Sequence, residues 1–171
     1  SVFHLKIEQK ELQVPTDNEE GHQHLICNVK KCDPGESGSA VTAYFLENQE
    51  YYEQRANVYG YADDTTRWAL LCRGVLEFLR KSTWVPDVIV SLDWQTGLVP
   101  NYLKTVYADD PVLSKISSVF SIHNLYFQGM FDHHFVSEMD FDDGPSAIPG
   151  FNTPRLEKLN FMRRGIRYAD S

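Results

Sequence analysis

The chain has 171 residues, of which 42% are hydrophobic and 23% charged, a composition that allows one globular domain with its own core. Its formal net charge is −8 and no lysine or arginine run exceeds two residues, which argues against a groove that follows nucleic-acid phosphates. No apolar run approaches the roughly 20 residues that span a bilayer, and residues 1–4 lack the features of a leader peptide, so we expect a cytoplasmic protein without nucleic-acid or membrane partners.

The first 46 residues are predicted to form β-strands. Three stretches rich in β-branched and aromatic residues are separated by polar or glycine-containing turns, namely residues 2–7, 24–30 and 40–46. Residues 33–38 form a clear turn cluster between the last two strands. The polar, tyrosine-rich residues 47–64 are expected to be a surface loop.

The three cysteines are Cys27, Cys32 and Cys72, an odd number without a secretory leader, so we expect free thiols. A zinc site built from His22, His24, Cys27 and Cys32 is disfavoured. The two histidines would share one strand face while Cys27 points to the other, and Cys-x4-Cys is not the usual ligand spacing. No metal site is therefore expected.

From residue 63 the pattern changes to alternating helices and strands. Asp63 or Asp64 can cap a helix that ends before Pro86. Its apolar residues recur at helical spacing: Trp68, Leu71, Cys72, Val75, Phe78 and Leu79. Residues 87–92 are nearly all apolar, as in a parallel strand covered on both faces.

A second helix over residues 96–108 and a second buried strand over residues 116–122 follow. Strand, helix and strand in this order form a βαβ unit, which predicts an α/β fold with a Rossmann-like parallel sheet flanked by helices. Residues 132–154 are expected to be a loop. Residues 155–170 are expected to form a helix with one apolar stripe, made of Leu156, Leu159, Met162 and Ile166.

Two polar segments follow the two predicted parallel strands, residues 93–97 and residues 123–129. Because ligands bind beyond the carboxyl ends of such strands, we expect Asp93 and His123 on the same rim. From position alone, Asp93 could equally cap the next helix, and His123 and Asn124 could satisfy backbone groups of the loop.

Four segments resemble glycogen and starch synthases, in family order over residues 47–170. Residues 93–98 resemble their D-W-Q/H-T/A-G segment, and residues 118–131 resemble S-V-F-T-I-H-N-L-x-Y-Q-G. Residues 59–67 are similar to Y-G-Y-x-D-D-x-x-R-F, and the end of residues 161–170 is similar to a helix ending in Y-A-D. Residues 1–46 carry no such signature.

The resemblance implies that residues 1–171 are part of the N-terminal, acceptor-side domain of a two-domain (GT-B type) glycosyltransferase, without the C-terminal nucleotide-sugar domain. The implied reaction transfers glucose from ADP-glucose or UDP-glucose to the non-reducing end of an α-1,4-glucan with retention. It needs no cofactor and no metal. The chain alone is expected to be inactive, because most donor contacts belong to the other domain.

The same resemblance implies roles for individual residues. His123 would place its imidazole on the 6-hydroxyl of the donor glucose, and Asp93 would balance positive charge in an oxocarbenium-like transition state. Asn124, Tyr59 and Gln95 are expected to bind substrate.

Other motif residues are expected to shape the site. Trp94 would pack beneath the loop, and Gln128 and Gly129 would form its turn. The acidic pairs 63–64, 109–110 and 142–143 are interpreted as solvated turns and helix caps.

The chain also departs from the family pattern. The glycine-rich Lys-x-Gly-Gly loop of the first strand is missing, and residues 90–92 (Val-Ser-Leu) replace a histidine-containing run. An interior strand missing from a parallel sheet predicts self-association, a rearranged strand order or limited stability. Two alternatives stay open: another two-domain glycosyltransferase or phosphorylase-like enzyme, and a non-catalytic glucan-binding or scaffold module.

Overall fold

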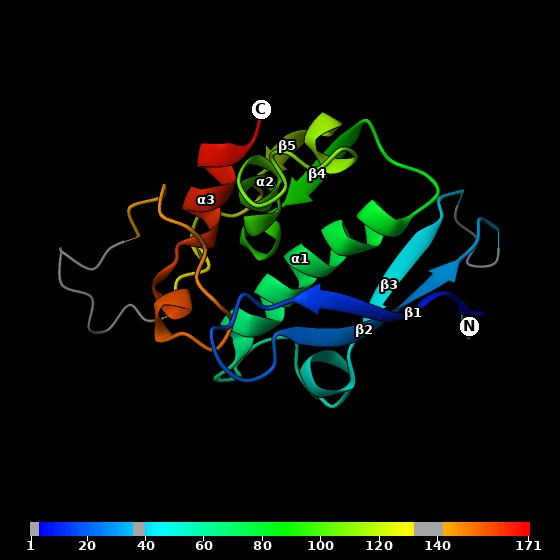
Figure 1. The fold of residues 1–171 in the computed structure, drawn as a ribbon, viewed down its shortest axis with the longest axis horizontal. Coiled ribbons are helices and arrows are strands. Elements are labelled where there is room, and N and C mark those ends of the chain that lie inside the picture. The colour runs from blue at the N-terminus through cyan, green and yellow to red at the C-terminus, as the bar shows by residue number, and fades with distance from the viewer. Residues whose placement is uncertain (1–3, 36–39, 132–141) are drawn as a thin grey trace.

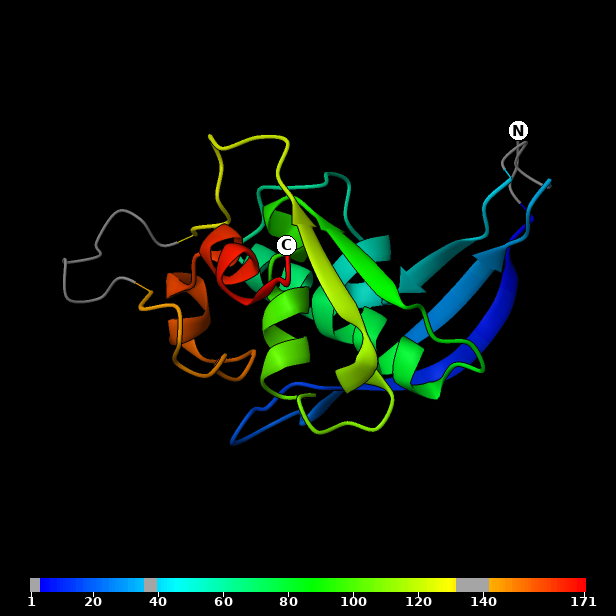
Figure 2. The same ribbon diagram turned by 90° about the horizontal axis from the view of Figure 1, so that it is seen from above.

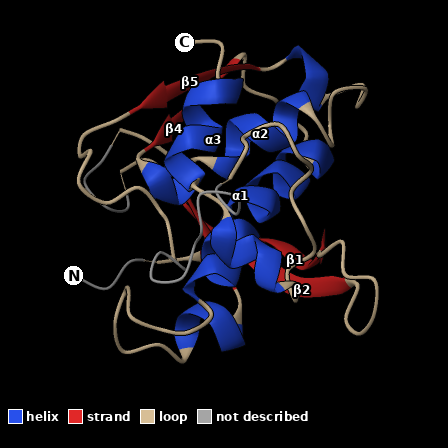
Figure 3. Cartoon of the chain, turned by 90° about the vertical axis from the view of Figure 1, so that its left-hand side faces the viewer, coloured by secondary structure: helices blue, strands red, loops and turns tan. Residues whose placement is uncertain are grey.

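The computed structural model describes residues 4–35, 40–131 and 142–171. Helices lie between two small β-sheets (Figures 1 and 3). One sheet is antiparallel, in the order β1 (Lys6–Pro15), β2 (His24–Cys32) and β3 (Ala43–Glu47). The other is parallel and pairs β4 (Val88–Leu92) with β5 (Ser117–Ser121). The predicted α/β class and parallel pairing are therefore confirmed.

The antiparallel sheet packs one face on the long helix α1 (Asp64–Lys81). Alternation explains this face, because Leu12 and Val14 of β1 and Cys27 and Val29 of β2 are all buried. The predicted first strand was wrong in extent, since β1 runs to Pro15. A positive φ of 51° at Glu11, where the register shifts, interrupts the period-two pattern that the prediction depended on.

Helix α1 confirms the predicted first helix and forms the centre of the core. Its buried face includes Ala69, Leu70, Cys72 and Leu76, all with no exposed surface. Residues 47–64 are not entirely loop, because Gln49–Glu53 form one π-helical turn capped by the Asn48 side chain.

The two parallel strands lie side by side across the helices (Figure 2), with α2 (Leu98–Lys104) and α3 (Phe161–Tyr168) packed together beneath them. Their register runs from Val88 opposite Ser117 to Leu92 opposite Ser121. The expectation that β4 is covered on both faces was wrong, since Val88, Val90 and Leu92 are each about half exposed. The helices cover one face only.

The C-terminal helix is shorter than predicted. Residues 154–158 form a 3-10 turn, and α3 begins only after Asn160, whose side chain accepts the N–H of Arg163 at 2.9 Å. The break shifts the helical phase, so Ile166 is exposed while Leu156, Leu159 and Met162 are buried. The second predicted helix is also shorter, because a 3-10 turn at Trp94–Thr96 precedes α2.

Parts of three predictions fall on residues outside the described ranges: residues 2–3 of the first strand, residues 36–38 of the turn cluster, and residues 132–141 of the long loop. In the described part of the chain, no helix is long and apolar enough to cross a membrane. The three cysteines are free and buried, and burial raises the pKa of the Cys27 and Cys72 thiols to about 12.

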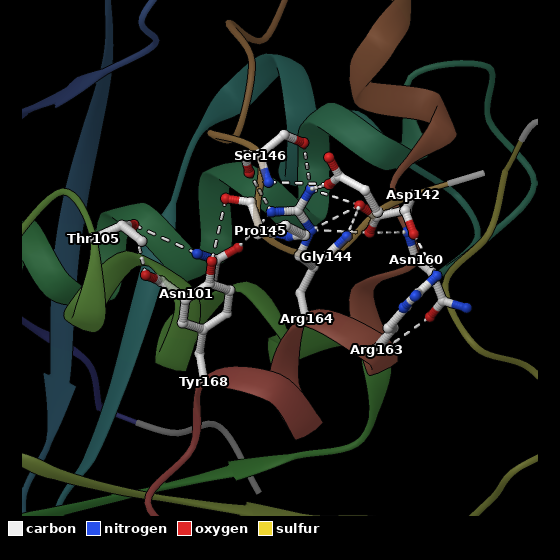
Figure 4. Close-up of polar contacts among 11 residues, drawn as sticks. Asn101, Thr105, Asp142, Gly144, Pro145, Ser146, Asn160, Arg163, Arg164 and Tyr168 are labelled. Carbon is white, nitrogen blue, oxygen red and sulfur yellow. Dashed lines mark hydrogen bonds and ion pairs between the residues drawn. The ribbon is translucent and has the colours of Figure 1, made fainter. Parts of the chain in front are cut away.

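A fully buried ion pair joins α3 to the segment before it (Figure 4). The Arg164 guanidinium donates to both carboxylate oxygens of Asp142, with Nη2 at 2.6 Å from Oδ1, and to the Ser146 carbonyl at 2.5 Å. The Asp142 carboxylate also accepts the N–H of Asn160 at 3.0 Å. The interpretation of Asp142 as a solvated residue was therefore wrong, because Arg164 and the backbone take the place of water.

Candidate functional site

A cleft of about 630 Å³ opens at the carboxyl ends of β4 and β5. Its walls come from the segment before α1, the turn after β4 and the loop after β5. The residues that line it are Tyr59, Gly60, Tyr61, Asp64, Asp93, Trp94, Gln95, Asn124, Phe127 and Phe131. An aromatic-rich, partly polar cleft at this edge of a parallel sheet is the expected position for a ligand.

Asp93 adopts an unusual backbone conformation directly after β4. Its φ of 55° and ψ of −179° belong to a region that residues other than glycine rarely enter. Its N–H donates to the Ser121 carbonyl at 2.9 Å, which extends the parallel pairing by one residue. The side chain makes no cap bond to the following turn, so the alternative of Asp93 as a helix cap is wrong.

The Asp93 carboxylate instead holds His123. Its Oδ1 accepts the backbone N–H of His123 at 2.6 Å, and its Oδ2 lies 3.1 Å from Nδ1 of the imidazole. The backbone hydrogen bond from His123, and then the imidazole, lower the pKa of Asp93. Nδ1 faces the carboxylate, while Nε2 is directed away from Asp93 and lies 3.5 Å from the Ser121 hydroxyl.

The predicted substrate-binding residues also come together. Nε2 of Gln95 donates to the Tyr59 hydroxyl at 2.7 Å, so two segments 36 residues apart meet across the cleft. Asn124 lines the same cleft, and its Oδ1 accepts the N–H of Tyr126 at 2.8 Å. His123 is beside Asp93 but is not among the lining residues, so it stands at the rim.

Trp94 forms the hub of the aromatic wall. Its ring is buried and lies 5.1 Å from Phe127, 5.5 Å from Phe131 and 5.6 Å from Trp68 between centroids. The side chain thus packs beneath the loop after β5, as predicted, and also contributes surface to the cleft.

Two motif glycines are required by this packing. Gly129 has a φ of 68°, and a Cβ there would lie 2.6 Å from the Trp94 ring and 2.9 Å from Phe161. A Cβ on Gly97 would overlap the Phe161 carbonyl oxygen. The predicted role of Gly129 in the turn is confirmed, and both glycines let α3 approach the site closely.

Several lining residues were not predicted as part of the site, among them Asp64, Phe127 and Phe131. Asp64 was grouped with Asp63 as a solvated turn or cap, yet it is buried at the cleft and paired with Arg67. The i, i+3 spacing of Asp64 and Arg67 on a predicted helix is the sequence signal from which this pair could have been predicted. Asp110, by contrast, belongs to a turn as expected, because its Oδ1 accepts the N–H groups of Val112 and Leu113 at 2.9 Å.

The residues that line the cleft offer oxygen and nitrogen atoms for hydrogen bonds, together with aromatic faces. This combination suits a polar, hydroxyl-rich ligand. Among the residues that the structure describes, no group of three or more histidine, cysteine, aspartate or glutamate side chains could hold a metal ion.

Comparison with known proteins gives a consistent assignment. Residues 3–171 match the family model of the starch synthase catalytic domain. The chain is 41% identical over 138 residues to glycogen synthase 2 of Geobacter sulfurreducens, covering 76% of this chain and 27% of that protein. It is 36% identical over 150 residues to glycogen synthase of Clostridium perfringens, covering 88% of this chain and 30% of that protein.

The fold also matches a solved structure. The catalytic domain of starch synthase IV from Arabidopsis thaliana, bound to ADP and acarbose, superimposes with a TM-score of 0.62 at 23% identity. The match covers 73% of this chain and 24% of that one. The chain therefore spans about a quarter to a third of the length of the relatives it matches.

Proposed function

Because this chain belongs to the family of starch synthase catalytic domains, we propose that it is the N-terminal, acceptor-side part of a retaining glucosyltransferase. The reaction transfers glucose from ADP-glucose or UDP-glucose to the non-reducing end of an α-1,4-glucan. The observation that carries this proposal is the Asp93–His123 pair, held at the rim of an aromatic cleft at the carboxyl edge of the parallel sheet.

The geometry supports specific roles. As the bond to the leaving nucleotide breaks, positive charge grows on the glucose ring, and a fixed carboxylate nearby stabilises it. Asp93 is ionised at neutral pH, and the His123 hydrogen bonds that lower its pKa stabilise this form. Its strained backbone is held by the His123 and Ser121 hydrogen bonds. His123 then presents Nε2 to a sugar hydroxyl, while Tyr59, Gln95 and Asn124 contact the glucan or glucose.

The remaining parts of the reaction are assigned to the rest of the protein. The related starch synthase IV domain binds ADP, which favours a nucleotide-sugar donor held between two domains. This chain holds the acceptor side of that cleft, so we expect no transfer by residues 1–171 alone. The expected self-association or limited stability of the isolated chain stays a prediction.

The test is glucose transfer by the full-length protein. Labelled ADP-glucose and UDP-glucose are each offered with glycogen, and incorporation of label is measured beside the isolated 171-residue chain. Incorporation by the full-length protein from one of the two donors supports the proposal. Glycogen binding without transfer from either donor would favour a glucan-binding module, and transfer by the isolated chain would contradict the division of roles.

A further inference from the structure

A buried ion pair lies directly under one wall of the cleft. The side chains of Asp64 and Arg67 are 8% and 5% exposed, and Oδ1 of Asp64 pairs with Nη1 of Arg67. The other carboxylate oxygen accepts the backbone N–H of Gly60 at 2.7 Å and that of Tyr61 at 3.2 Å. Both carboxylate oxygens of Asp64 thus act as acceptors. Arg67 is the only side chain among their donors in these bonds, and the other donors are backbone N–H groups.

Arg67 extends the network to the segment before the cleft. Its Nε donates to the Tyr51 carbonyl at 2.7 Å, and its Nη1 donates to the Val58 carbonyl at 3.0 Å. The guanidinium also lies over the Tyr61 ring, 5.1 Å from the centroid. One side chain of α1 therefore binds backbone groups on either side of residues 52–57.

The residue between these anchored positions is Tyr59. The Val58 carbonyl before it is bound by Arg67, and the Gly60 N–H after it is bound by Asp64. Gly60 has a φ of 99°, so the backbone turns sharply at the point where Asp64 holds it. The Asp64–Arg67 pair therefore fixes the backbone on both sides of Tyr59. None of these hydrogen bonds involves the side chain of Tyr59.

The tyrosine side chain is itself placed for a ligand. Its ring is half exposed and lies 5.8 Å from Trp68 and 6.0 Å from Trp94 between centroids. Its hydroxyl accepts from Gln95 at 2.7 Å. These contacts leave one part of the ring facing the cleft, where an aromatic face and a hydroxyl suit a sugar.

We propose that Asp64 and Arg67 are positioning residues that fix Tyr59 in its ligand-binding orientation before the sugar arrives. The proposal rests on the proposed function for the identity of the sugar. A buried ion pair adds little net stability, because desolvation offsets the attraction, but it selects one backbone arrangement. A pre-ordered side chain avoids the entropy cost of ordering upon binding, and so raises affinity.

Binding of maltoheptaose to the full-length protein, measured by titration calorimetry, tests the proposal. Asp64→Asn retains one acceptor oxygen, so either the Gly60–Tyr61 N–H groups or Arg67 must face an amide NH₂. We expect the Kd to rise about tenfold, the usual scale of one lost pre-ordered contact. An unchanged Kd in a folded Asp64→Asn protein would overturn the proposal.

A double-mutant cycle shows whether the effect passes through Tyr59. The Kd for maltoheptaose is measured for Asp64→Asn, for Tyr59→Ala and for the double variant. If Asp64 acts by positioning Tyr59, its replacement changes the Kd little once the ring is gone. Full additivity of the two effects would show that Asp64 acts elsewhere, and would overturn the proposal.

Gly60→Ala covers the case in which Asp64→Asn does not fold. A Cβ at Gly60 meets no atom within 4 Å, so the strain comes from φ alone and the ion pair stays intact. Gly21→Ala is the matched control, because Gly21 has a φ of 84°, equally open surroundings and a position in the β1–β2 connection. We expect weaker binding for Gly60→Ala and wild-type binding for Gly21→Ala; equal Kd values for the two would overturn the proposal.

The proposed reaction and the positioning role of Asp64 and Arg67 can be contradicted separately. A wild-type protein that binds maltoheptaose but does not transfer glucose contradicts the proposed reaction, while the variants still test the positioning role. A wild-type protein that transfers glucose, with a Kd unchanged by Asp64→Asn and Gly60→Ala, contradicts only the positioning role. A wild-type protein with neither property overturns both.

Discussion

Two carboxylates of this chain each hold a basic side chain, and they differ in almost every other respect. Asp142 and Arg164 have side-chain exposures of 2% and 0%, and their hydrogen bonds go to each other and to nearby protein groups. Asp93 and His123 are 28% and 61% exposed, and the imidazole is open to solvent on one side. The first pair binds the molecule together, and the second faces a cleft.

The difference shows how a structural pair is distinguished from a chemical one. Both carboxylate oxygens of Asp142 accept hydrogen bonds from Arg164, and Oδ2 also accepts the N–H of Asn160, so no oxygen is directed at a ligand. Asp93 has a strained backbone conformation, and it lies at the edge of the sheet where the parallel strands end. Asp17 is also exposed and at positive φ, so what indicates the site at Asp93 is that exposure and strain coincide with a position in the cleft at the strand ends.

The largest expected effect concerns the buried pair. Asp142→Asn removes the buried counter-charge of the Arg164 guanidinium and leaves only the exposed carboxylate of Asp143 near it, so we expect a loss of about 3–5 kcal/mol in the free energy of unfolding. Urea denaturation of the full-length protein measures it. Asp143→Asn is the control, since this carboxylate lies 3.8 Å from the same guanidinium but is 57% exposed, so its loss should change stability far less. Equal stability of the two variants would contradict the comparison.

The exposed pair is expected to show the opposite pattern. In the full-length protein, His123→Ala should lower kcat by about 10²–10³, the usual result of losing one transition-state contact. The melting temperature should stay close to wild type, because the imidazole is largely exposed. Steady-state kinetics and thermal melts on the same sample separate the two. A folded variant with wild-type turnover would exclude the proposed role of His123.

A smaller effect is expected for Asp93→Asn. Asparagine can still accept the N–H of His123, but it removes the charge that, in the proposed reaction, stabilises a developing cation on the sugar. We therefore expect kcat to fall about tenfold or more, with little change in the glucan KM. Kinetics at saturating donor, with glucan varied, measure both. A change confined to KM would assign Asp93 to binding instead of catalysis.

The smallest effect concerns pH. The pKa of Asp93 is lowered in the folded state by its His123 hydrogen bonds, so its contribution to stability is present above the unfolded pKa of about 3.9 and is lost as pH falls through the folded value. The stability difference between wild type and Asp93→Asn should thus shrink as the pH falls from about 5 to about 3. Urea titrations at these pH values check it, and a gap that widens on acidification would contradict the assignment.

The parallel strands and the rim were predictable because their signals are local. An apolar run followed by Asp93 or His123 places the polar residue at a strand end without any knowledge of the partner strand. Residues whose role depends on distant partners were not predictable. Asp142 becomes buried through Arg164, 22 residues away, and the exposed face of β4 depends on what packs there rather than on its own sequence.

The predicted boundaries of helices and strands were wrong where the periodicity of the sequence is interrupted. The positive φ at Glu11 shifts the register of β1, and the turn that precedes Asn160 resets the phase of the last helix. The prediction for Asp64 was wrong for another reason. An acidic pair before a helix is typical of a cap, and only the folded loop around Gly60 shows that Asp64 turns back to bind it.

The backbone at Asp93 has a consequence for anyone who engineers this protein. Glycine adopts φ 55° and ψ −179° without strain, so a selection for heat resistance alone favours Asp93→Gly where the relief of strain exceeds the loss of the His123 hydrogen bonds. The same substitution deletes the carboxylate that holds His123. Thermostability screens on this scaffold should therefore enrich inactive variants at position 93, and a combined screen should retain aspartate there despite its conformational penalty.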